Sequence, residues 1–247
     1  MNPNLKPFYK LLQAWKHDER ILAVLGLGSL ARPKRMDEFS DYDFFLIVKD
    51  DAKSTFLKQT TWLKLNQSQY RFRNTVDGFK AIVEGDVFIE CAIFTISELE
   101  SIPYDRPKLY WIRSGVDSKN IPLKKRKISS YDTSYYFEEC WSQLYVGLGR
   151  YLRGEKYAAL QMIQGYAVES YLKATLPLWP KAIEQDPFVY VRRFEQAYPY
   201  LREDLTMLLG GYTAIPESAK TLYEMLVHHH GEHPLQSLIL ERLKKCQ

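Results

Sequence analysis

The sequence predicts an α+β domain with a mixed β-sheet and flanking helices, followed by an all-α helical bundle. Two observations indicate this fold class. Up to the basic run "PLKKRK" at residues 122–127, short apolar runs alternate with helical ones. After it, apolar residues recur at the spacings of one buried helix face. We therefore expect two domains, residues 1–125 and 126–247, each long enough to bury its own core.

Four runs in the first half are typical of β-strands because they are short and rich in apolar, β-branched and aromatic residues. They cover residues 21–29, 42–48, 79–85 and 87–94. Helices are expected over residues 8–20 and 51–65. Asp50 or Asp51 is a candidate N-cap for the second of these helices. The S-x-x-E spacing of Ser97 and Glu100 predicts a capping box after the fourth strand.

The second half shows a helical period. Its first apolar stripe consists of Phe137, Cys140, Trp141, Leu144, Leu148, Tyr151 and Leu152. Further helices are expected over residues 155–175, 186–209 and 216–245. Prolines punctuate these stretches, as expected at helix boundaries.

Composition narrows the class of protein. The chain has 247 residues, of which 46% are hydrophobic and 26% charged, as in ordinary globular proteins. A formal net charge of +4 does not by itself demand nucleic acid as a partner. The three cysteines are too widely spaced to suggest a disulfide framework or a zinc-ligand pair. The sequence lacks an apolar signal-peptide core and a membrane-length apolar run, so we expect a cytoplasmic protein.

Two aspartates stand at the start of the second expected strand. Since alternate side chains of a strand share a face, Asp41 and Asp43 point the same way. Their mutual repulsion must be offset, and a divalent cation with oxygen ligands does so in a water-accessible cleft. The pair therefore predicts a magnesium site, although an S-D-x-D segment alone is also a common start for a strand.

Two further features belong to the same candidate site. Gly28 lets a phosphate approach the backbone, and Ser29 offers a hydroxyl at an expected helix start, where free N–H groups favour anions. Glu90 lies inside an otherwise apolar strand, where a charge is costly unless it is paired. Taken alone, the first feature fits a simple turn and the second an edge-strand charge. Their order along the chain favours a phosphate-binding turn followed by metal-binding carboxylates.

These residues resemble the nucleotidyltransferases of the DNA polymerase β superfamily. The resemblance rests on Gly28-Ser29, on "SDYD" at residues 40–43 and on Glu90 as a third carboxylate. Within the superfamily, the chain looks most like the lincosamide and aminoglycoside antibiotic enzymes, some of which carry a C-terminal helical domain. One departure is Pro33, since family members often have a glycine a few residues after the G-S pair.

The resemblance implies a nucleotidyltransferase-type sheet, a site and a reaction. Asp41, Asp43 and Glu90 would be catalytic and would hold one or two Mg²⁺ ions, while Gly28 and Ser29 would bind the nucleotide triphosphate, with ATP expected. Whether Glu90 is a metal ligand or the base stays open. Lys173 is a candidate for reaching the triphosphate from the helical domain. A nucleoside monophosphate would pass to a hydroxyl of a small molecule, such as an antibiotic, bound between the two domains.

Alternatives remain at this stage. An RNA acceptor would need a broad basic surface, whereas 34 Lys and Arg face 30 Asp and Glu, so nucleic acid is not the expected partner. A non-catalytic nucleotide-binding or partner-binding module of the same fold is the other alternative. No membrane association is expected, and a homodimer is one option for the oligomeric state. The histidines in "LVHHHGEH", residues 226–233, are expected in a loop because Gly231 and Pro234 break the helix, and no zinc site is predicted.

Overall fold

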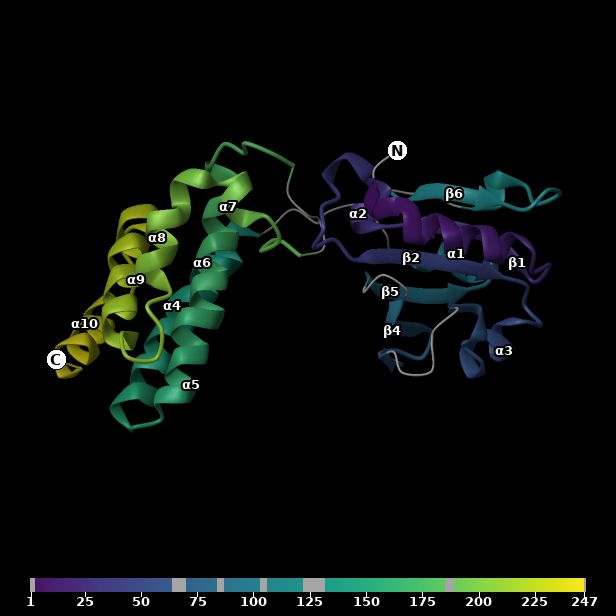
Figure 1. The fold of residues 1–247 in the computed structure, drawn as a ribbon. Helices are drawn as coiled ribbons and strands as arrows, with labels where there is room; N and C mark the ends of the chain where they lie inside the picture. Colours follow the sequence, from purple (N-terminus) through teal and green to yellow (C-terminus); the bar gives the residue numbers. More distant parts are fainter. Residues whose placement is uncertain are drawn as a thin grey trace. The chain divides into compact units, whose positions relative to one another are not determined.

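The structure is a computed structural model of the full chain. It describes residues 3–63, 70–83, 87–102, 106–121, 132–184 and 189–246. The chain divides into an N-terminal unit, Met1–Lys127, and a C-terminal unit, Ile128–Gln247 (Figure 1). The predicted boundary between residues 125 and 126 lies outside the described residues and stays a prediction.

A mixed β-sheet forms the centre of the N-terminal unit. Its strands are β1 (Ile21–Gly26), β2 (Tyr42–Val48), β3 (Arg71–Phe72), β4 (Gly78–Val83), β5 (Val87–Phe94) and β6 (Lys108–Ile112). Their order across the sheet is β3-β4-β5-β2-β1-β6. The pairing of β2 with β5 is parallel and the other pairings are antiparallel. The predicted fold class, a mixed sheet with flanking helices before a helical bundle, is confirmed.

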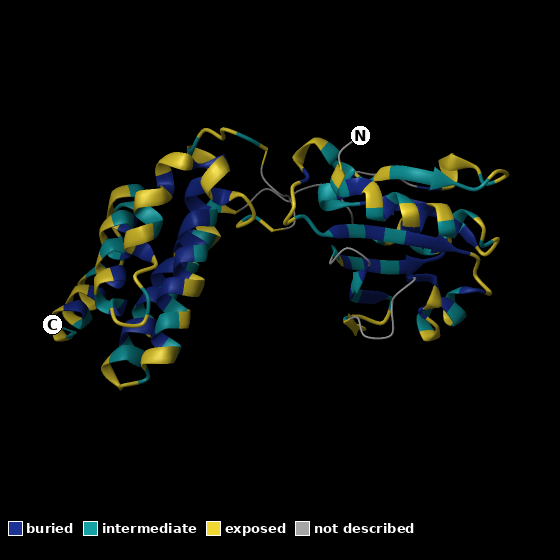
Figure 2. Ribbon diagram, in the orientation of Figure 1, coloured by how far each residue is buried: buried dark blue, intermediate teal, exposed yellow. Residues whose placement is uncertain are grey.

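Alternation along β2 gives the sheet two different faces. Tyr42, Phe44, Leu46 and Val48 pack in one apolar core with side chains of helix α1 (Lys6–Lys16). Residues of the opposite parity, such as Phe45 and Ile47, belong to a second and smaller core on the other face. Figure 2 shows the resulting buried stripes along the strands. Asp43 shares the parity of Phe45, so it lies on the face opposite α1.

Strand predictions in this unit are confirmed where apolar and other residues alternate clearly along the sequence. The expected strands over 42–48 and 87–94 coincide with β2 and β5, whereas the short strands β3 and β6 were not predicted. The remaining short elements are η1 (Pro3–Leu5), α2 (Gly28–Ala31), η2 (Pro33–Arg35), α3 (Lys53–Lys58), η3 (Thr61–Leu63), η4 (Ser97–Glu100) and η5 (Ser118–Asn120).

Two predicted helix caps differ from the structure. Neither Asp50 nor Asp51 caps α3, which begins after Ala52 without a side-chain cap. The helix η4 begins after Ile96 without a side-chain cap, so the expected capping box of Ser97 and Glu100 is not formed. Instead, the backbone N–H of Thr95 donates to Oε2 of Glu98 at 2.8 Å, and the Thr95 hydroxyl donates to the same oxygen at 3.2 Å. The bond from the Thr95 N–H to Glu98 is the glutamate half of a capping box, two residues earlier than the expected S-x-x-E pair.

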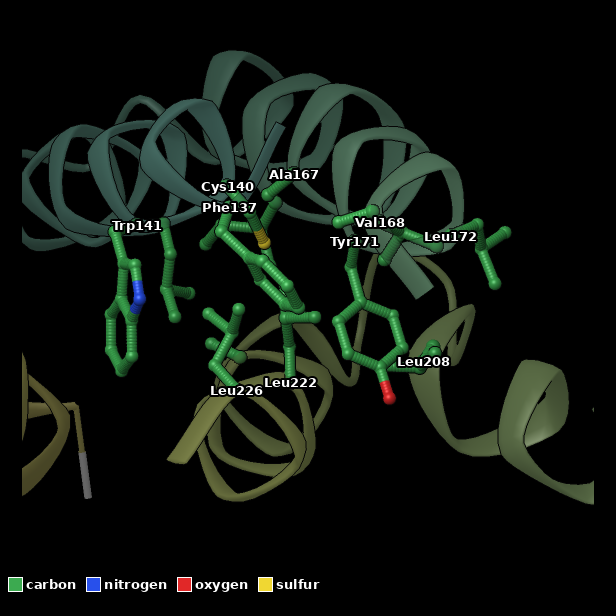
Figure 3. Close-up of a cluster of buried hydrophobic side chains, with 14 of the residues drawn as sticks. Phe137, Cys140, Trp141, Ala167, Val168, Tyr171, Leu172, Leu208, Leu222 and Leu226 are labelled. Atoms are coloured by element: carbon green, nitrogen blue, oxygen red, sulfur yellow. The ribbon is translucent and has the colours of Figure 1, made fainter. Parts of the chain in front are cut away.

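The C-terminal unit is helical. Its elements are α4 (Thr133–Leu152), α5 (Lys156–Leu160), the π-helical segment η6 (Gln161–Ala167), α6 (Val168–Thr175), η7 (Leu176–Leu178), α7 (Phe194–Ala197), η8 (Pro199–Leu201), α8 (Arg202–Leu208), α9 (Ile215–His230) and α10 (Gln236–Lys245). Its core gathers side chains from α4, α6, α8 and α9, among them Trp141, Tyr171, Leu208 and Leu222 (Figure 3). None of the helices in the described ranges is long and apolar enough to span a membrane.

The π-helical segment lies between α5 and α6 and presents a polar side chain to the core. Gln164 is buried, and its amide exchanges two hydrogen bonds of 2.9 Å with the backbone of Gly211. Its Nε2 also lies 3.2 Å from Oγ of Ser218. With these partners, the hydrogen-bonding groups of the buried amide are satisfied. The segment therefore has a structural role in connecting helices.

Candidate functional site

The turn after β1 approaches the second aspartate closely. The backbone N–H of Leu27 donates to the carbonyl oxygen of Asp43 at 2.7 Å. Gly28 has a positive φ of 45°, and a Cβ built on it would overlap Oδ2 of Asp43. Both the conformation and the space therefore require glycine at this position. Gly28 of the predicted Gly28-Ser29 pair therefore lies against the predicted metal ligand Asp43, and Ser29 follows in α2.

A tyrosine from the edge of the sheet secures this turn. Oη of Tyr110, in β6, donates to the carbonyl oxygen of Leu30 at 2.9 Å. Burial raises the pKa of Tyr110 to about 12, so its hydroxyl stays a hydrogen-bond donor at neutral pH. No local pattern indicates this contact, because Tyr110 and Leu30 are far apart along the chain.

The two aspartates lie at the start of β2. Asp43 is the second residue of β2 and Asp41 lies just before the strand; both are half-buried, whereas Tyr42 between them is buried. The carboxylate of Asp43 therefore lies on the face of the sheet opposite the ring of Tyr42. That Asp41 shares this face stays a prediction. Asp43 makes further interactions beyond its backbone bond to Leu27.

Glu90 is the register partner of Asp43 in the parallel pairing of β2 with β5. Its Oε1 accepts a hydrogen bond of 2.9 Å from the side-chain amide of Asn74, and its Oε2 lies 3.4 Å from Nζ of Lys80. The cost of a charge within an apolar strand is thus offset by two polar partners. Sequence reasoning missed both Asn74 and Lys80, since a loop amide and a strand lysine carry no motif.

The carboxylates fit a hard divalent cation in their chemistry. Asp41, Asp43 and Glu90 offer oxygen donors, which Mg²⁺ prefers. The missing Cβ of Gly28 lets Oδ2 of Asp43 approach the turn closely. Within the described residues, however, no three Asp, Glu, His or Cys side chains are grouped closely enough to hold a metal ion. The three-ligand set therefore stays a prediction.

Lys173 lies in α6 of the C-terminal unit. Its Nζ is 2.5 Å from Oε1 of Glu169, one helical turn earlier, and 5.2 and 5.5 Å from the ring centroids of Tyr136 and Tyr190. The ammonium group is thus held by a carboxylate and two aromatic faces. Its predicted reach to a triphosphate stays a prediction.

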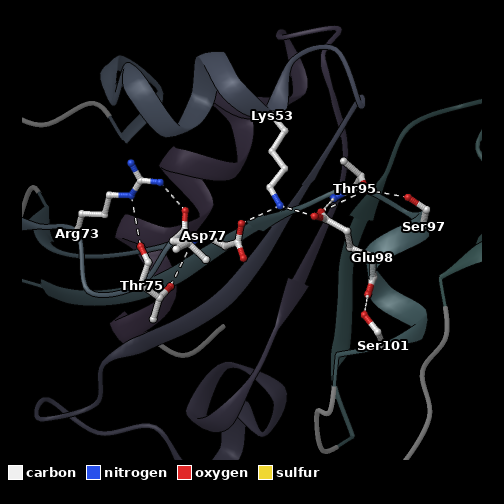
Figure 4. Close-up of polar contacts among 9 residues, drawn as sticks. Lys53, Arg73, Thr75, Asp77, Thr95, Ser97, Glu98 and Ser101 are labelled. Carbon is white, nitrogen blue, oxygen red and sulfur yellow. Dashed lines mark hydrogen bonds and ion pairs between the residues drawn. The ribbon is translucent and has the colours of Figure 1, made fainter.

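A partly buried lysine near the end of β5 was not predicted. Nζ of Lys53 pairs with Asp77 at 2.8 Å and with Glu98 at 2.5 Å (Figure 4). Burial acts to lower the pKa of Lys53, but its hydrogen bonds to the two carboxylates outweigh burial and the net shift is upward. Burial likewise acts to raise the pKa of Glu98, yet its bonds to Lys53 and Thr95 bring it below its ordinary value. This network ties α3 to the loop before β4 and to the turn after β5.

A pocket of about 410 Å³ lies elsewhere in the N-terminal unit. It is lined by the end of α1, by residues 18–21 and by residues 55–62 around α3 and η3. Ile21 pairs with Val48, whereas Gly26 pairs with Phe44 beside Asp43, so the pocket and the aspartates are at opposite ends of β1. The pocket is therefore not the predicted phosphate site.

The histidine-rich segment is helical where a loop was expected. Residues 228–230 form the last turn of α9, so the prediction of a loop is wrong up to residue 230. Nδ1 of His230 accepts a hydrogen bond of 3.0 Å from Nε1 of Trp141, and Nδ1 of His229 lies 3.0 Å from the hydroxyl of Tyr171. Both rings act as partners of buried aromatic side chains.

The sequence matches one family model, that of streptomycin adenylyltransferase, over residues 6–66. This segment contains Gly28, Ser29, Asp41 and Asp43 but ends before Glu90. The match confirms the resemblance to antibiotic nucleotidyltransferases and supports a nucleotidyltransferase enzyme. No curated protein matches the sequence.

Three solved structures are similar to the chain. An aminoglycoside 6-adenyltransferase from Bacillus subtilis is 14% identical, with a TM-score of 0.39 and 96% of each chain covered. A nucleotidyltransferase-like protein from Exiguobacterium sibiricum 255-15 is 12% identical, with a TM-score of 0.37, covering 98% of this chain and 80% of that one. A STING-associated CdnE c-di-GMP synthase from Capnocytophaga granulosa is 14% identical, with a TM-score of 0.29, and the match covers 97% of this chain and 80% of that one.

Proposed function

We propose that this chain transfers a nucleoside monophosphate from a nucleotide triphosphate to a hydroxyl of a small molecule, in a magnesium-dependent reaction. The observation that carries the proposal is the close approach of Gly28 to Asp43, where a glycine turn suited to phosphate meets a carboxylate suited to metal. ATP is the proposed donor, because the matching family is named for adenylyl transfer. The same name favours a hydroxylated antibiotic as acceptor.

Asp41 and Asp43 are the proposed principal ligands of one or two Mg²⁺ ions, with Glu90 as a third candidate. When bound, the metal would neutralise charge that develops on the triphosphate during transfer. The protein's own contribution is to present Asp43 from β2, a strand that the β1 and β5 pairings hold in place, with Asp41 just before that strand. Gly28 and Ser29 would present backbone and hydroxyl groups to the phosphates.

Glu90 has two candidate roles, base and metal ligand, and we propose the base. It would take the proton of the acceptor hydroxyl as the hydroxyl oxygen forms a bond to the α-phosphorus. The bond between the α-phosphorus and the bridging oxygen to the β-phosphate then breaks, and pyrophosphate leaves with that electron pair. Each carboxylate oxygen has more than one lone-pair site, so Glu90 can accept this proton while it keeps its contacts to Asn74 and Lys80.

The helical residues 126–247 are the proposed acceptor-binding domain, with Lys173 as a proposed contact to the triphosphate. Two alternatives predict different results. An RNA-directed enzyme would add nucleotides to an RNA end and would bind RNA less tightly as salt increases. A non-catalytic module would bind nucleotide without releasing pyrophosphate.

The test is a turnover screen of the purified chain. Each of the four ribonucleotide triphosphates is combined with MgCl₂ and a panel of hydroxylated antibiotics, and pyrophosphate release and product mass are measured. We expect one antibiotic to gain the mass of a nucleoside monophosphate, and Asp43→Asn to abolish the signal. Nucleotide binding without pyrophosphate release on any acceptor would contradict the proposal, as would products formed only on added tRNA or single-stranded RNA.

A further inference from the structure

The loop between β3 and β4 brings one amide to the third carboxylate of the candidate site. Nδ2 of Asn74 donates to Oε1 of Glu90 at 2.9 Å. On the other side of the same carboxylate, Nζ of Lys80 lies 3.4 Å from Oε2. Lys80 is the register partner of Glu90 in the pairing of β4 with β5, so its position is set by the sheet. The two oxygens thus face different donors.

The need for such donors follows from the surroundings of Glu90. Its side chain is 42% exposed and stands beside Asp43 on the same face of the sheet. A glutamate in that position has several rotamers available and is repelled by the neighbouring carboxylate. Donors on both oxygens favour one orientation over the others, and a fixed orientation is what proton transfer from a substrate requires.

The loop is built so that the amide of Asn74 lies close to the sheet. A Cβ on Gly78 would lie 2.8 Å from Oδ1 of Asn74 and 2.7 Å from Oγ1 of Thr75. Oδ1 of Asn74 is buried and has no hydrogen-bond partner within the described part of the chain. An asparagine whose oxygen gains nothing from its site is held there by its Nδ2 contact to Glu90 and by the shape of the loop.

We propose that Asn74 is a positioning residue, whose side-chain amide fixes the carboxylate of Glu90 together with Lys80. This inference rests on the proposed function, because it assigns the orientation of Glu90 a part in nucleotidyl transfer. It distinguishes Asn74 from its neighbours in the loop. Arg73, for example, donates to the backbone carbonyls of Thr75 at 3.3 Å and Val76 at 2.5 Å, and so supports only the loop itself (Figure 4).

The kinetic test compares three variants of the full chain. Asn74→Ala removes the amide, Asn74→Asp keeps its shape but replaces the donor with a carboxylate, and Arg73→Ala weakens the loop without touching Glu90. We expect both Asn74 variants to lower kcat about tenfold or more, with the KM for nucleotide changed less than about twofold. Arg73→Ala should stay near wild type in kcat. A wild-type kcat in Asn74→Asp, or an equal loss in Arg73→Ala, would overturn the proposal.

A spectroscopic measurement tests the contact without any turnover. In the metal-free protein labelled with ¹⁵N, the side-chain amide signal of Asn74 is identified by its absence from Asn74→Ala. A hydrogen bond to a charged carboxylate differs from one to a neutral amide, so Glu90→Gln should shift this signal. An unchanged signal would refute the contact and with it the positioning role. If the wild-type chain transfers no nucleotide to any acceptor, the proposed function fails while this measurement still decides the contact.

Discussion

Asp43 and Glu90 lie side by side on neighbouring strands, because the parallel pairing of β2 with β5 places them in register. The pairing is parallel although the rest of the sheet is antiparallel, so the two carboxylates come from segments that are far apart in sequence. Two like charges on one face repel each other and need compensation. The structure supplies part of it at Glu90, through Asn74 and Lys80.

The first prediction concerns the aspartate pair. Asp41→Asn and Asp43→Asn keep the size of the side chains but remove one charge each from the proposed metal site. We expect each to reduce kcat/KM on the order of a hundredfold or more, with the thermal midpoint little changed. Asp50→Asn is the matched control, since Asp50 is exposed and lies past the other end of the same strand. Near-normal magnesium-dependent turnover in both site variants would refute the assignment.

The second prediction separates the two roles of Glu90. If Glu90 is the base, Glu90→Gln should abolish transfer but retain magnesium-dependent nucleotide binding, because only the proton acceptor is lost. If Glu90 is a metal ligand, nucleotide affinity should fall together with turnover. Calorimetric titration of nucleotide into the variant, with and without magnesium, distinguishes the two. Full activity would exclude both roles.

The third prediction uses two glycines with the same backbone handedness. Gly28→Ala adds a Cβ that overlaps Oδ2 of Asp43, whereas Gly115→Ala, at a φ of 86°, adds one that meets nothing within 4 Å. Each should cost about 1–2 kcal/mol of stability, because both positions require the left-handed region. Only Gly28→Ala should also lower kcat/KM, by about tenfold or more, since it displaces a proposed ligand. Equal activity of the two variants in a steady-state assay would contradict this account.

Strong local patterns in the sequence predicted the centre of the N-terminal unit. The strands β2 and β5 coincide with the apolar runs over 42–48 and 87–94, whose alternation is marked. The edge strand β6 was missed because it is short, only half-buried and paired with a distant strand. In the C-terminal unit, the expected helix over 186–209 is broken, and Arg193 adopts a left-handed φ of 58° before α7.

The residues of the candidate site also divide into those that a local sequence pattern predicts and those that it does not. Gly28, Asp41, Asp43 and Glu90 could be proposed because each belongs to a motif or interrupts a pattern. Their supporting side chains could not. Lys80 meets Glu90 only through the register of β4 with β5. Outside the candidate site, Lys53 likewise meets Asp77 and Glu98 only after three separate segments have packed. Such contacts depend on which segments pair in the folded chain, and the spacing of residues within one segment does not predict them.

The fourth prediction concerns stability and pH. Lys53→Met leaves Asp77 and Glu98 without the cation that pairs with both, and should cost on the order of 1–3 kcal/mol near neutral pH. The pKa of Glu98 is lowered from an ordinary value of 4.5, so its favourable pairing is present above that pH and is lost as the pH falls through the lowered pKa. The pKa of Lys53 is raised from 10.5, so its charge is retained throughout this acidic range.

The difference between wild type and Lys53→Met should therefore shrink on acidification from about pH 7 to about pH 3. Urea unfolding followed by circular dichroism at several pH values measures it. Lys58→Met is the control, because Lys58 is an exposed residue of the same helix. A difference that stays constant over this range would show that the methionine acts through packing and not through the lost ion pair.

The fifth prediction concerns Lys173, the proposed contact of the C-terminal unit to the triphosphate. Lys173→Met removes the ammonium group and should raise the KM for nucleotide about tenfold, with a smaller change in kcat, if the charge acts mainly in binding. Lys220→Met is the matched control. Lys220 also pairs with a glutamate one helical turn away, Glu224, but both side chains are more than 60% exposed.

A second variant separates a nucleotide contact from a structural role. Glu169→Gln removes the carboxylate 2.5 Å from Lys173 but leaves the ammonium group in place. If Lys173 binds phosphate, this variant should lower the KM for nucleotide, because the charge no longer has a competing partner. If Lys173 serves only to hold α6 through Glu169 and the rings of Tyr136 and Tyr190, both variants should lose thermal stability and activity in parallel. Parallel losses would therefore reject Lys173 as a nucleotide-binding residue, whereas opposite changes in KM at unchanged stability would establish its contact with the triphosphate.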